Sequence, residues 1–300
     1  MDYQTLAIEL QGNFPNLRVL LQEPMKNHCS FRIGGPADIF VEPENEMELS
    51  SLCAFLQEMG VKPVIIGNGS NLLVSDGGVR GVVVHLGERY GFVQVEDDCI
   101  YAEAGVTLAH LAVIAKEHGL AGLEFAHGIP GTLGGAIMMN AGAYGGEMKD
   151  VVTHVRYMNA WGYTGETDEP GFGYRRSFFS DKDYVIIGAR LKLTKDSPEN
   201  IHARMMELWS KRSSSQPLDK PSAGSTFKRP KNGYAAAMID EAGLKGLRVG
   251  GAQVSEKHAG FVINTGDATA ADVKALIAKI QESVLANTGT KLEPEVKFIG

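Results

Sequence analysis

The chain has 300 residues, of which 44% are hydrophobic and 22% are charged, which is typical of ordinary globular proteins. Its formal net charge is −7 and its pI is about 5.7, so the composition disfavours a nucleic-acid-binding protein and a protein that binds anionic membranes. The length predicts two or three domains.

The sequence also carries information about compartment and metals. The N-terminus lacks the basic and apolar regions of a signal peptide, and no apolar stretch is long enough to span a bilayer. Cys29, Cys53 and Cys99 are widely spaced and match neither a metal-binding nor a disulfide pattern. We therefore predict a cytoplasmic protein without a metal site.

Residues 1–88 are predicted to combine helices with short strands. Helical periodicity covers residues 5–12 and 44–59. Apolar runs predict the strands, at residues 38–41, 64–66, 72–74 and 82–84. Gly67-Asn68-Gly69-Ser70-Asn71 lies between two of these strands and lacks a third glycine, so it is not a Rossmann fingerprint. Its consecutive N–H groups are nevertheless suited to hold a pyrophosphate.

The middle of the chain is richer in strands. The pattern predicts a helix over residues 107–118 and strands at residues 92–95, 100–103, 151–158, 163–167, 184–188 and 189–193. The pair 151–158 and 163–167 is expected to be hydrogen-bonded. Residues 30–195 as a whole are rich in strands and have few helices, which predicts an α+β region rather than regular βαβ winding.

The last third is predicted to combine helices with two strands. Ser197 and Pro198 begin one helix, residues 211–223 read as a polar connector, and a short helix covers residues 234–241. Thr269 with Asp272 forms a capping box for another helix. The strands of this part are expected at residues 261–264 and 292–299.

A second glycine-rich stretch, residues 122–147, holds eight of the chain's 36 glycines. Gly128–Thr132 predicts a tight turn, and Thr132 is expected to cap a short helix that ends at Met139. The N–H groups at such a helix start favour a phosphate. One such loop alone could equally reflect packing, but two loops favour a bound nucleotide cofactor that contains a pyrophosphate.

Several polar residues are candidates for chemistry, and each has a simpler interpretation. Ser225 lacks a nucleophile elbow and fits a turn, Arg175 fits a solvated or stacked side chain, and Glu295 fits an exposed charge. The histidines have no metal-ligand spacing. Basic clusters at residues 211–212 and 228–231 favour a small anionic ligand.

Six motifs together resemble the UDP-N-acetylmuramate dehydrogenase family, also called the UDP-N-acetylenolpyruvoylglucosamine reductases. They are NHCSFRIGGPADIF, IGNGSNLLVSDGGVRGVVV, GLEFAHGIPGTLGGAIMMNAGAYGGE, FGYRRSFF, SAGSTFKRP and LEPEVKFIG, in the family's order from residue 27 to the end. The resemblance implies an α+β fold with a two-lobed FAD-binding region of the vanillyl-alcohol-oxidase (PCMH) type and a smaller C-terminal α+β substrate domain. The expected boundaries are residues 1–88 for lobe 1, 89–196 for lobe 2 and 197–300 for the substrate domain, with residues 293–300 returning to lobe 1.

The resemblance also implies a reaction of peptidoglycan synthesis with FAD as bound cofactor and NADPH as co-substrate. NADPH reduces the flavin, which then passes a hydride to the enolpyruvyl group of a nucleotide sugar. Ser225 would protonate C2, while Arg175 and Glu295 would stabilise the enolate of the substrate carboxylate. Because an ionised Glu295 would repel the enolate, we expect its pKa to be raised in the substrate complex.

The same resemblance implies the binding residues. The FAD contacts are expected at Gly67, Asn68, Gly69, Ser70, Asn71, Ile129, Pro130, Gly131, Thr132, Gly134, Gly135, Asn140, Gly142 and Ile186. Substrate or nucleotide contacts are expected at Arg212, Gln216, Lys228 and His258, for which a solvated rim is the alternative. No obligatory protein partner is evident.

The sequence departs from the family's pattern in two places, and two other functions are alternatives to the reductase activity. Residues 143–150 leave no room for the tyrosine loop of the family's longer members, so the chain is predicted to be of the shorter subtype, and Arg229 stands where many members have asparagine. One rival is another flavin oxidoreductase on the same fold, which would not need Ser225, Arg175 and Glu295 together. The other is a non-catalytic flavin- or nucleotide-binding regulator.

Overall fold

The computed structural model describes residues 2–300, which fold into two compact units. Unit 1 comprises residues 2–21, 39–68 and 81–211, and unit 2 comprises residues 22–38, 69–80 and 212–300. The division into three domains at residues 88 and 196 stays a prediction. Among the described residues, no helix has both the length and the apolar character needed to cross a membrane.

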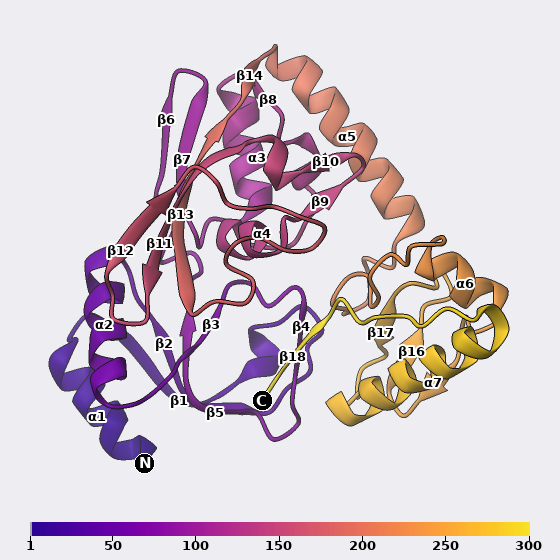
Figure 1. The fold of residues 1–300 in the computed structure, drawn as a ribbon, viewed down its shortest axis with the longest axis horizontal. Helices are drawn as coiled ribbons and strands as arrows, with labels where there is room; N and C mark the ends of the chain where they lie inside the picture. Colours follow the sequence, from indigo (N-terminus) through magenta and orange to yellow (C-terminus); the bar gives the residue numbers. More distant parts are fainter. Residues whose placement is uncertain (1) are drawn as a thin grey trace. The chain divides into compact units, whose positions relative to one another are not determined.

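Unit 1 is built on an antiparallel sheet with the strand order β12-β11-β13-β7-β6 (Figure 1). The bounds of these strands are Val93–Glu96 (β6), Cys99–Glu103 (β7), Val152–Asn159 (β11), Thr164–Thr167 (β12) and Tyr184–Lys192 (β13). The predicted pair is confirmed, since Met158 of β11 lies opposite Thr164 of β12. Residues 184–193, predicted as two strands, form the single strand β13 up to Lys192.

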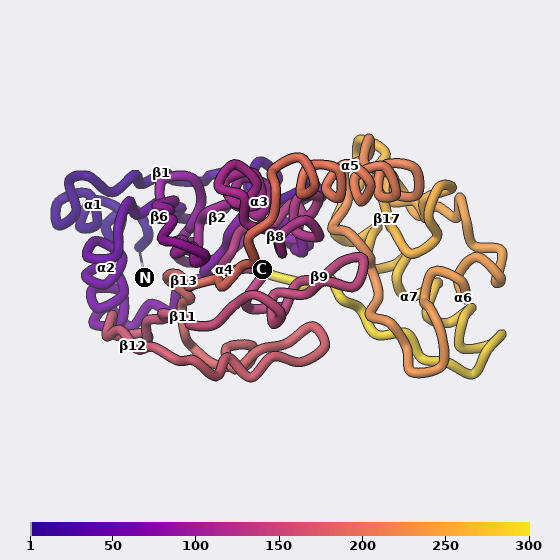
Figure 2. Tube along the Cα trace, turned by 90° about the horizontal axis from the view of Figure 1, so that it is seen from above, coloured from indigo at the N-terminus to yellow at the C-terminus, as the bar shows by residue number. Residues whose placement is uncertain are grey.

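Helices pack on this framework. Helix α4 (Leu133–Met139) packs against β13 and β7, and α3 (Leu108–Glu117) begins at Thr107, whose hydroxyl accepts a hydrogen bond from the His110 N–H. Helices α1 (Tyr3–Asn13) and α2 (Glu46–Glu58) lie side by side in Figures 1 and 2. The rings of Phe14 and Phe55 meet edge to face, with their centroids 5.7 Å apart.

Helix α5 (Pro198–Ser215) corrects one prediction. Residues 211–215 are helical although the sequence was interpreted there as a connector. Lysine, arginine and serine are tolerated on an exposed helix face, so their polarity did not mark the end of the helix.

A second sheet has the order β1-β2-β5-β3, with β3 parallel to β5. Its strands are Arg18–Pro24 (β1), Pro36–Glu42 (β2), Val64–Ile66 (β3) and Val79–His85 (β5). Strand β1 was not predicted because it buries none of its side chains fully and so lacks an apolar run. Two further two-stranded pairs join Leu120–Ala121 (β8) to Thr194–Lys195 (β14) and Gly142–Ala143 (β9) to Gly146–Glu147 (β10).

Unit 2 has its own hydrophobic core around α7 (Ala270–Thr288), beside which α6 (Ala235–Glu241) lies (Figures 1 and 2). The capping box of Thr269 and Asp272 is confirmed. A three-stranded sheet packs on α7 and consists of Arg248–Val249 (β15), Ala252–Val254 (β16) and Val262–Asn264 (β17).

The C-terminal strand is shorter than predicted. Only Lys297–Ile299 (β18) forms a strand, which pairs in parallel with Leu72–Val74 (β4). The preceding residues turn away from β4 because their backbone bonds to another segment: the Lys228 N–H donates to the Glu293 carbonyl and the Glu295 N–H to the Thr226 carbonyl, both at 2.8 Å.

Candidate functional site

The two glycine loops meet in unit 1. A Cβ atom added to Gly67 would collide with the hydroxyl of Thr132 and lie 3.2 Å from its Cβ and Cγ2. The Asn68 amide nitrogen lies 3.5 Å from the carbonyl oxygen of Pro130. Residue 67 must therefore be glycine for the backbones to approach this closely.

The rest of the first loop belongs to unit 2. Gly69 has φ = 57°, and a Cβ there would lie 2.8 Å from the Cα of Cys29. The hydroxyl of Ser30 is 3.4 Å from the carbonyl of Ser70. The backbone of this loop is thus held from behind by residues 28–30.

The second loop is anchored by its backbone to residues 104–108. Leu108 donates to the Gly131 carbonyl at 2.9 Å, and Gly134 donates to the Ala104 carbonyl at 2.9 Å. Helix α4 begins after Thr132 as predicted, but the side chain of Thr132 makes no capping bond. That part of the prediction was wrong, because the hydroxyl faces Gly67 instead.

These loops fit a dinucleotide with a pyrophosphate. Two glycine-rich backbones packed together leave main-chain groups uncovered by side chains, and a ligand phosphate can approach them closely. The start of α4 lies in the same stretch and adds partial positive charge.

Asn140, predicted to bind FAD, is the centre of a hydrogen-bond network with Glu147, Lys149 and Gly173, which we call the hub. It is 1% exposed and has φ = 42° at the C-terminal end of α4. Its amide donates to Glu147 at 2.8 Å and to the Gly173 carbonyl at 3.2 Å, and its Oδ1 accepts from the Lys149 N–H at 2.9 Å. Sequence reasoning missed this role, for which no local pattern exists.

The hub holds the turn that carries Arg175. Gly173 and Arg176 exchange backbone hydrogen bonds of 2.9 and 3.3 Å, and Arg175 between them has φ = 54°. Its guanidinium carbon lies 5.2 Å from the centre of the Tyr174 ring. The pKa of Glu147 is lowered, mainly by the hydrogen bond from Lys149 and in smaller part by the charge of Arg175. A left-handed arginine is strained, and such strain is concentrated at functional sites.

In unit 2 a backbone pairing brings together the segments that carry Ser225 and Glu295. The Thr226 carbonyl accepts from the Glu295 N–H at 2.8 Å, while Thr226 itself donates to the Gly260 carbonyl at 2.8 Å. The Ser225 side chain is exposed beside this fixed pairing, and Glu295 is half-buried. The Asn71 amide donates to the Glu295 carbonyl at 3.2 Å, which joins the first glycine loop to the same segment.

The expected substrate contacts vary in their surroundings. The Nζ atom of Lys228 lies 3.5 Å from a carboxylate oxygen of Glu293. Burial lowers the pKa of His258, and its Nδ1 accepts a hydrogen bond from the Gly260 N–H at 3.2 Å. The Oε1 atom of Gln216 is buried and has no hydrogen-bond partner among residues 2–300. A buried acceptor without a partner is costly, so a ligand or water is expected there. Arg212 is half-buried one helical turn before Gln216.

The remaining predicted FAD residues lie in unit 1. Ile186 is 4% exposed in β13, and Gly142 belongs to the β9–β10 hairpin, which turns at Tyr144 and Gly145. Arg175 also belongs to unit 1, whereas Ser225, Glu295 and the four expected substrate contacts belong to unit 2. Within residues 2–300, no group of three or more His, Cys, Asp or Glu side chains is arranged to hold a metal ion.

Comparison with known proteins defines the class first. Residues 37–168 match the family model of the FAD binding domain. Alkyldihydroxyacetonephosphate synthase has the same fold over 65% of this chain and 41% of its own, with a TM-score of 0.51 and 17% identity. The chain is therefore an α+β protein with an FAD-binding region of the vanillyl-alcohol-oxidase type, followed by a smaller C-terminal domain.

The particular family follows from closer matches. Residues 216–299 match the C-terminal domain of UDP-N-acetylenolpyruvoylglucosamine reductase. The enzymes of that name from Agathobacter rectalis and Caldanaerobacter subterraneus are 48% and 50% identical, over 99% and 94% of both chains in each comparison. The crystal structure of the Thermus caldophilus reductase has a TM-score of 0.80 and 36% identity, covering 95% of this chain and 99% of that one. The chain belongs to the UDP-N-acetylenolpyruvoylglucosamine reductase family.

Proposed function

We propose that this protein reduces UDP-N-acetylglucosamine enolpyruvate to UDP-N-acetylmuramate, with bound FAD and with NADPH as the reductant, in the cytoplasmic synthesis of peptidoglycan precursors. Full-length similarity to the reductases supports the reaction. When bound, FAD supplies the storage of a hydride between NADPH and the substrate. The three cysteines form no disulfide, which is consistent with a reducing compartment.

The backbone pairing of Thr226 with Glu295 is the observation that carries the proposal. It brings the segment that carries the exposed Ser225 hydroxyl against the segment that carries Glu295, without using either side chain. The Asn71 amide ties the same segment to the first glycine loop. The segments that carry the proposed proton donor and the proposed enolate-stabilising group are thereby joined to the loop that is proposed to bind the cofactor.

The roles of these groups follow from their chemistry. Ser225 Oγ–H gives its proton to C2 of the enolpyruvyl group, and its hydroxyl is accessible because Ser225 is exposed. Glu295 in its protonated form donates a hydrogen bond to the developing enolate, which requires the raised pKa expected for the substrate complex.

Arg175 is proposed to bind the substrate carboxylate. Its planar guanidinium can donate two parallel hydrogen bonds to the two carboxylate oxygens. The tight turn between Gly173 and Arg176, held by Asn140, fixes the backbone from which the side chain extends. Fixing this backbone before the substrate binds lowers the entropy lost in reaching the transition state.

The binding residues are proposed in two groups. Gly67–Asn71, Ile129–Gly135, Asn140, Gly142 and Ile186 would hold FAD, with Asn140 acting through the hub described above. Lys228 and Arg212 would neutralise the anionic nucleotide, while Gln216 and neutral His258 would accept or donate hydrogen bonds. Residues 1–88, 89–196 and 197–300 are the proposed domains.

The two half-reactions provide the test. Purified protein should be yellow, lose its flavin absorbance with NADPH under anaerobic conditions and regain it with UDP-N-acetylglucosamine enolpyruvate, but not with UDP-N-acetylglucosamine. Reoxidation by oxygen alone, with an alcohol or amine as the reductant, would favour another flavin oxidoreductase. FAD binding without reduction by NADPH would favour a regulator.

A further inference from the structure

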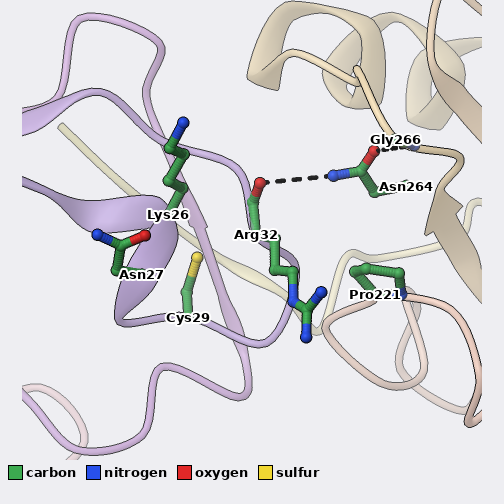
Figure 3. Close-up of a pocket in the computed structure, with 7 residues that line it drawn as sticks. All are labelled: Lys26, Asn27, Cys29, Arg32, Pro221, Asn264 and Gly266. Atoms are coloured by element: carbon green, nitrogen blue, oxygen red, sulfur yellow. Dashed lines mark hydrogen bonds between the residues drawn. The ribbon is translucent and has the colours of Figure 1, made fainter.

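A pocket of about 550 Å³ opens in unit 2. Figure 3 shows Lys26, Asn27, Cys29 and Arg32 on one side and Pro221, Asn264 and Gly266 on the other. A volume of this size is within the range of small-molecule sites. None of the seven lining residues belongs to the proposed site.

The charge of the pocket is one-sided. Lys26 and Arg32 are its ionisable residues besides the Cys29 thiol, whose pKa is raised by burial, and no acidic side chain lines it. Neither cation forms an ion pair with any of residues 2–300, whereas basic neighbours do: His28 pairs with Glu23 at 2.9 Å and Arg80 with Asp38 at 2.7 Å. The pocket therefore offers two positive charges to a ligand.

The wall that carries Arg32 is anchored by hydrogen bonds of Asn264. Asn264, 4% exposed, donates from Nδ2 to the carbonyls of Phe31 at 3.1 Å and Arg32 at 3.4 Å. Its Oδ1 accepts from the N–H groups of Gly266 at 2.8 Å and Ala268 at 3.1 Å. Arg32 is thereby held at φ = 54°, a conformation that arginine rarely adopts. Such a strained residue is a reason to look for function.

We propose that this pocket is a second anion site, which binds a small molecule through a phosphoanhydride group. Figure 3 shows the side chains of Lys26 and Arg32 extending in opposite directions, so that the ammonium and the guanidinium are well separated. An elongated anion with two phosphates matches two separated cations better than one phosphate does. The site lies behind the first glycine loop, because Cys29 of the pocket is the residue on which Gly69 packs.

The test is isothermal titration calorimetry of the FAD-loaded protein with inorganic pyrophosphate, in the presence of saturating UDP to fill the nucleotide-sugar site. The expected result is one pyrophosphate per chain, with binding weaker at high salt and weaker still for inorganic phosphate. Lys26→Gln and Arg32→Gln should each lower the affinity about tenfold or more, because each removes a charge-assisted contact. Both residues are exposed, so these variants are expected to fold.

Lys279→Gln is the matched control, because Lys279 is an exposed lysine of α7 in the same unit and lies outside the pocket. It should bind pyrophosphate as the unmodified chain does. Three results would each overturn the proposal: no binding up to about 10 mM, far above the micromolar range of ordinary specific ligands; equal affinity in all variants; or loss of binding in Lys228→Gln but not in Lys26→Gln. The proposal does not depend on the reductase activity.

Discussion

Gly67→Ala is the sharpest perturbation of the contact between the two glycine loops. The new methyl group would collide with the Thr132 hydroxyl and lie 3.2 Å from two further Thr132 carbons. Thr132 cannot move away easily, since it is 2% exposed and its carbonyl accepts from the Ala136 N–H at 2.9 Å. The loops must therefore separate.

Overpacking of this kind costs about 1–3 kcal/mol of unfolding free energy. If both loops hold the same pyrophosphate, separation also weakens FAD binding, and a loss of about 1.4 kcal/mol corresponds to tenfold in Kd. We expect FAD affinity to fall about tenfold or more. Thr132→Ala removes the colliding atoms, so the double variant should recover about 1 kcal/mol relative to the sum of the single effects.

The assays are urea unfolding of the apoprotein and fluorescence titration with FAD for both single variants and the double variant. Gly12→Ala in α1 is the control, because no atom lies within 4 Å of the added Cβ. It should leave FAD binding unchanged and stabilise the helix by up to about 1 kcal/mol. Unchanged stability and FAD affinity in Gly67→Ala would refute the claim that the loops must touch at this point.

Three further predictions follow from single residues. Ser225→Ala should leave flavin reduction by NADPH intact and slow substrate reduction by about two orders of magnitude or more, as rapid-mixing absorbance would measure; equal loss of both half-reactions would remove Ser225 from the protonation step. Asp76→Ala should cost about 1–3 kcal/mol in urea unfolding, because Asp76 accepts bonds of 2.7 and 3.0 Å from the Ala270 and Ala271 N–H groups at the start of α7; an unchanged midpoint would contradict this. Burial lowers the pKa of His258, so this histidine binds a proton more strongly in the unfolded chain than in the folded one. The stability that His258 contributes is therefore present above pH about 6.5 and is lost as the pH falls below that value. His258→Gln should make the free energy of unfolding depend less on pH in this range, and an unchanged pH dependence would argue against the prediction.

The sequence predicted those parts of the fold that have a local signal. The capping box at Thr269, the start of α3 at Thr107 and the pairing of β11 with β12 are confirmed because side-chain caps and apolar periodicity act over a few residues. The exposed strand β1 and the two-residue strands have no such periodicity. The pairing partner of residues 292–295 could not be predicted either, because it lies about 65 residues away in the sequence.

The candidate site could be predicted only in its parts. Glycine spacing indicated two loops that suit a phosphate, and the family motifs indicated Ser225, Arg175 and Glu295. The collision that fixes Gly67 against Thr132, the hub at Asn140 and the pocket beside Arg32 depend on residues far apart in the chain. Such contacts follow from the folded backbone and leave no local pattern.

The most direct measurement of the central claim is a crystal structure of the protein with FAD and UDP-N-acetylglucosamine enolpyruvate bound. We predict the pyrophosphate of FAD against the backbone of both Gly67–Asn71 and Ile129–Gly135, with Ser225, Arg175 and Glu295 around the enolpyruvyl group. A pyrophosphate that contacts neither loop, or an enolpyruvyl group remote from these three side chains, would contradict the account.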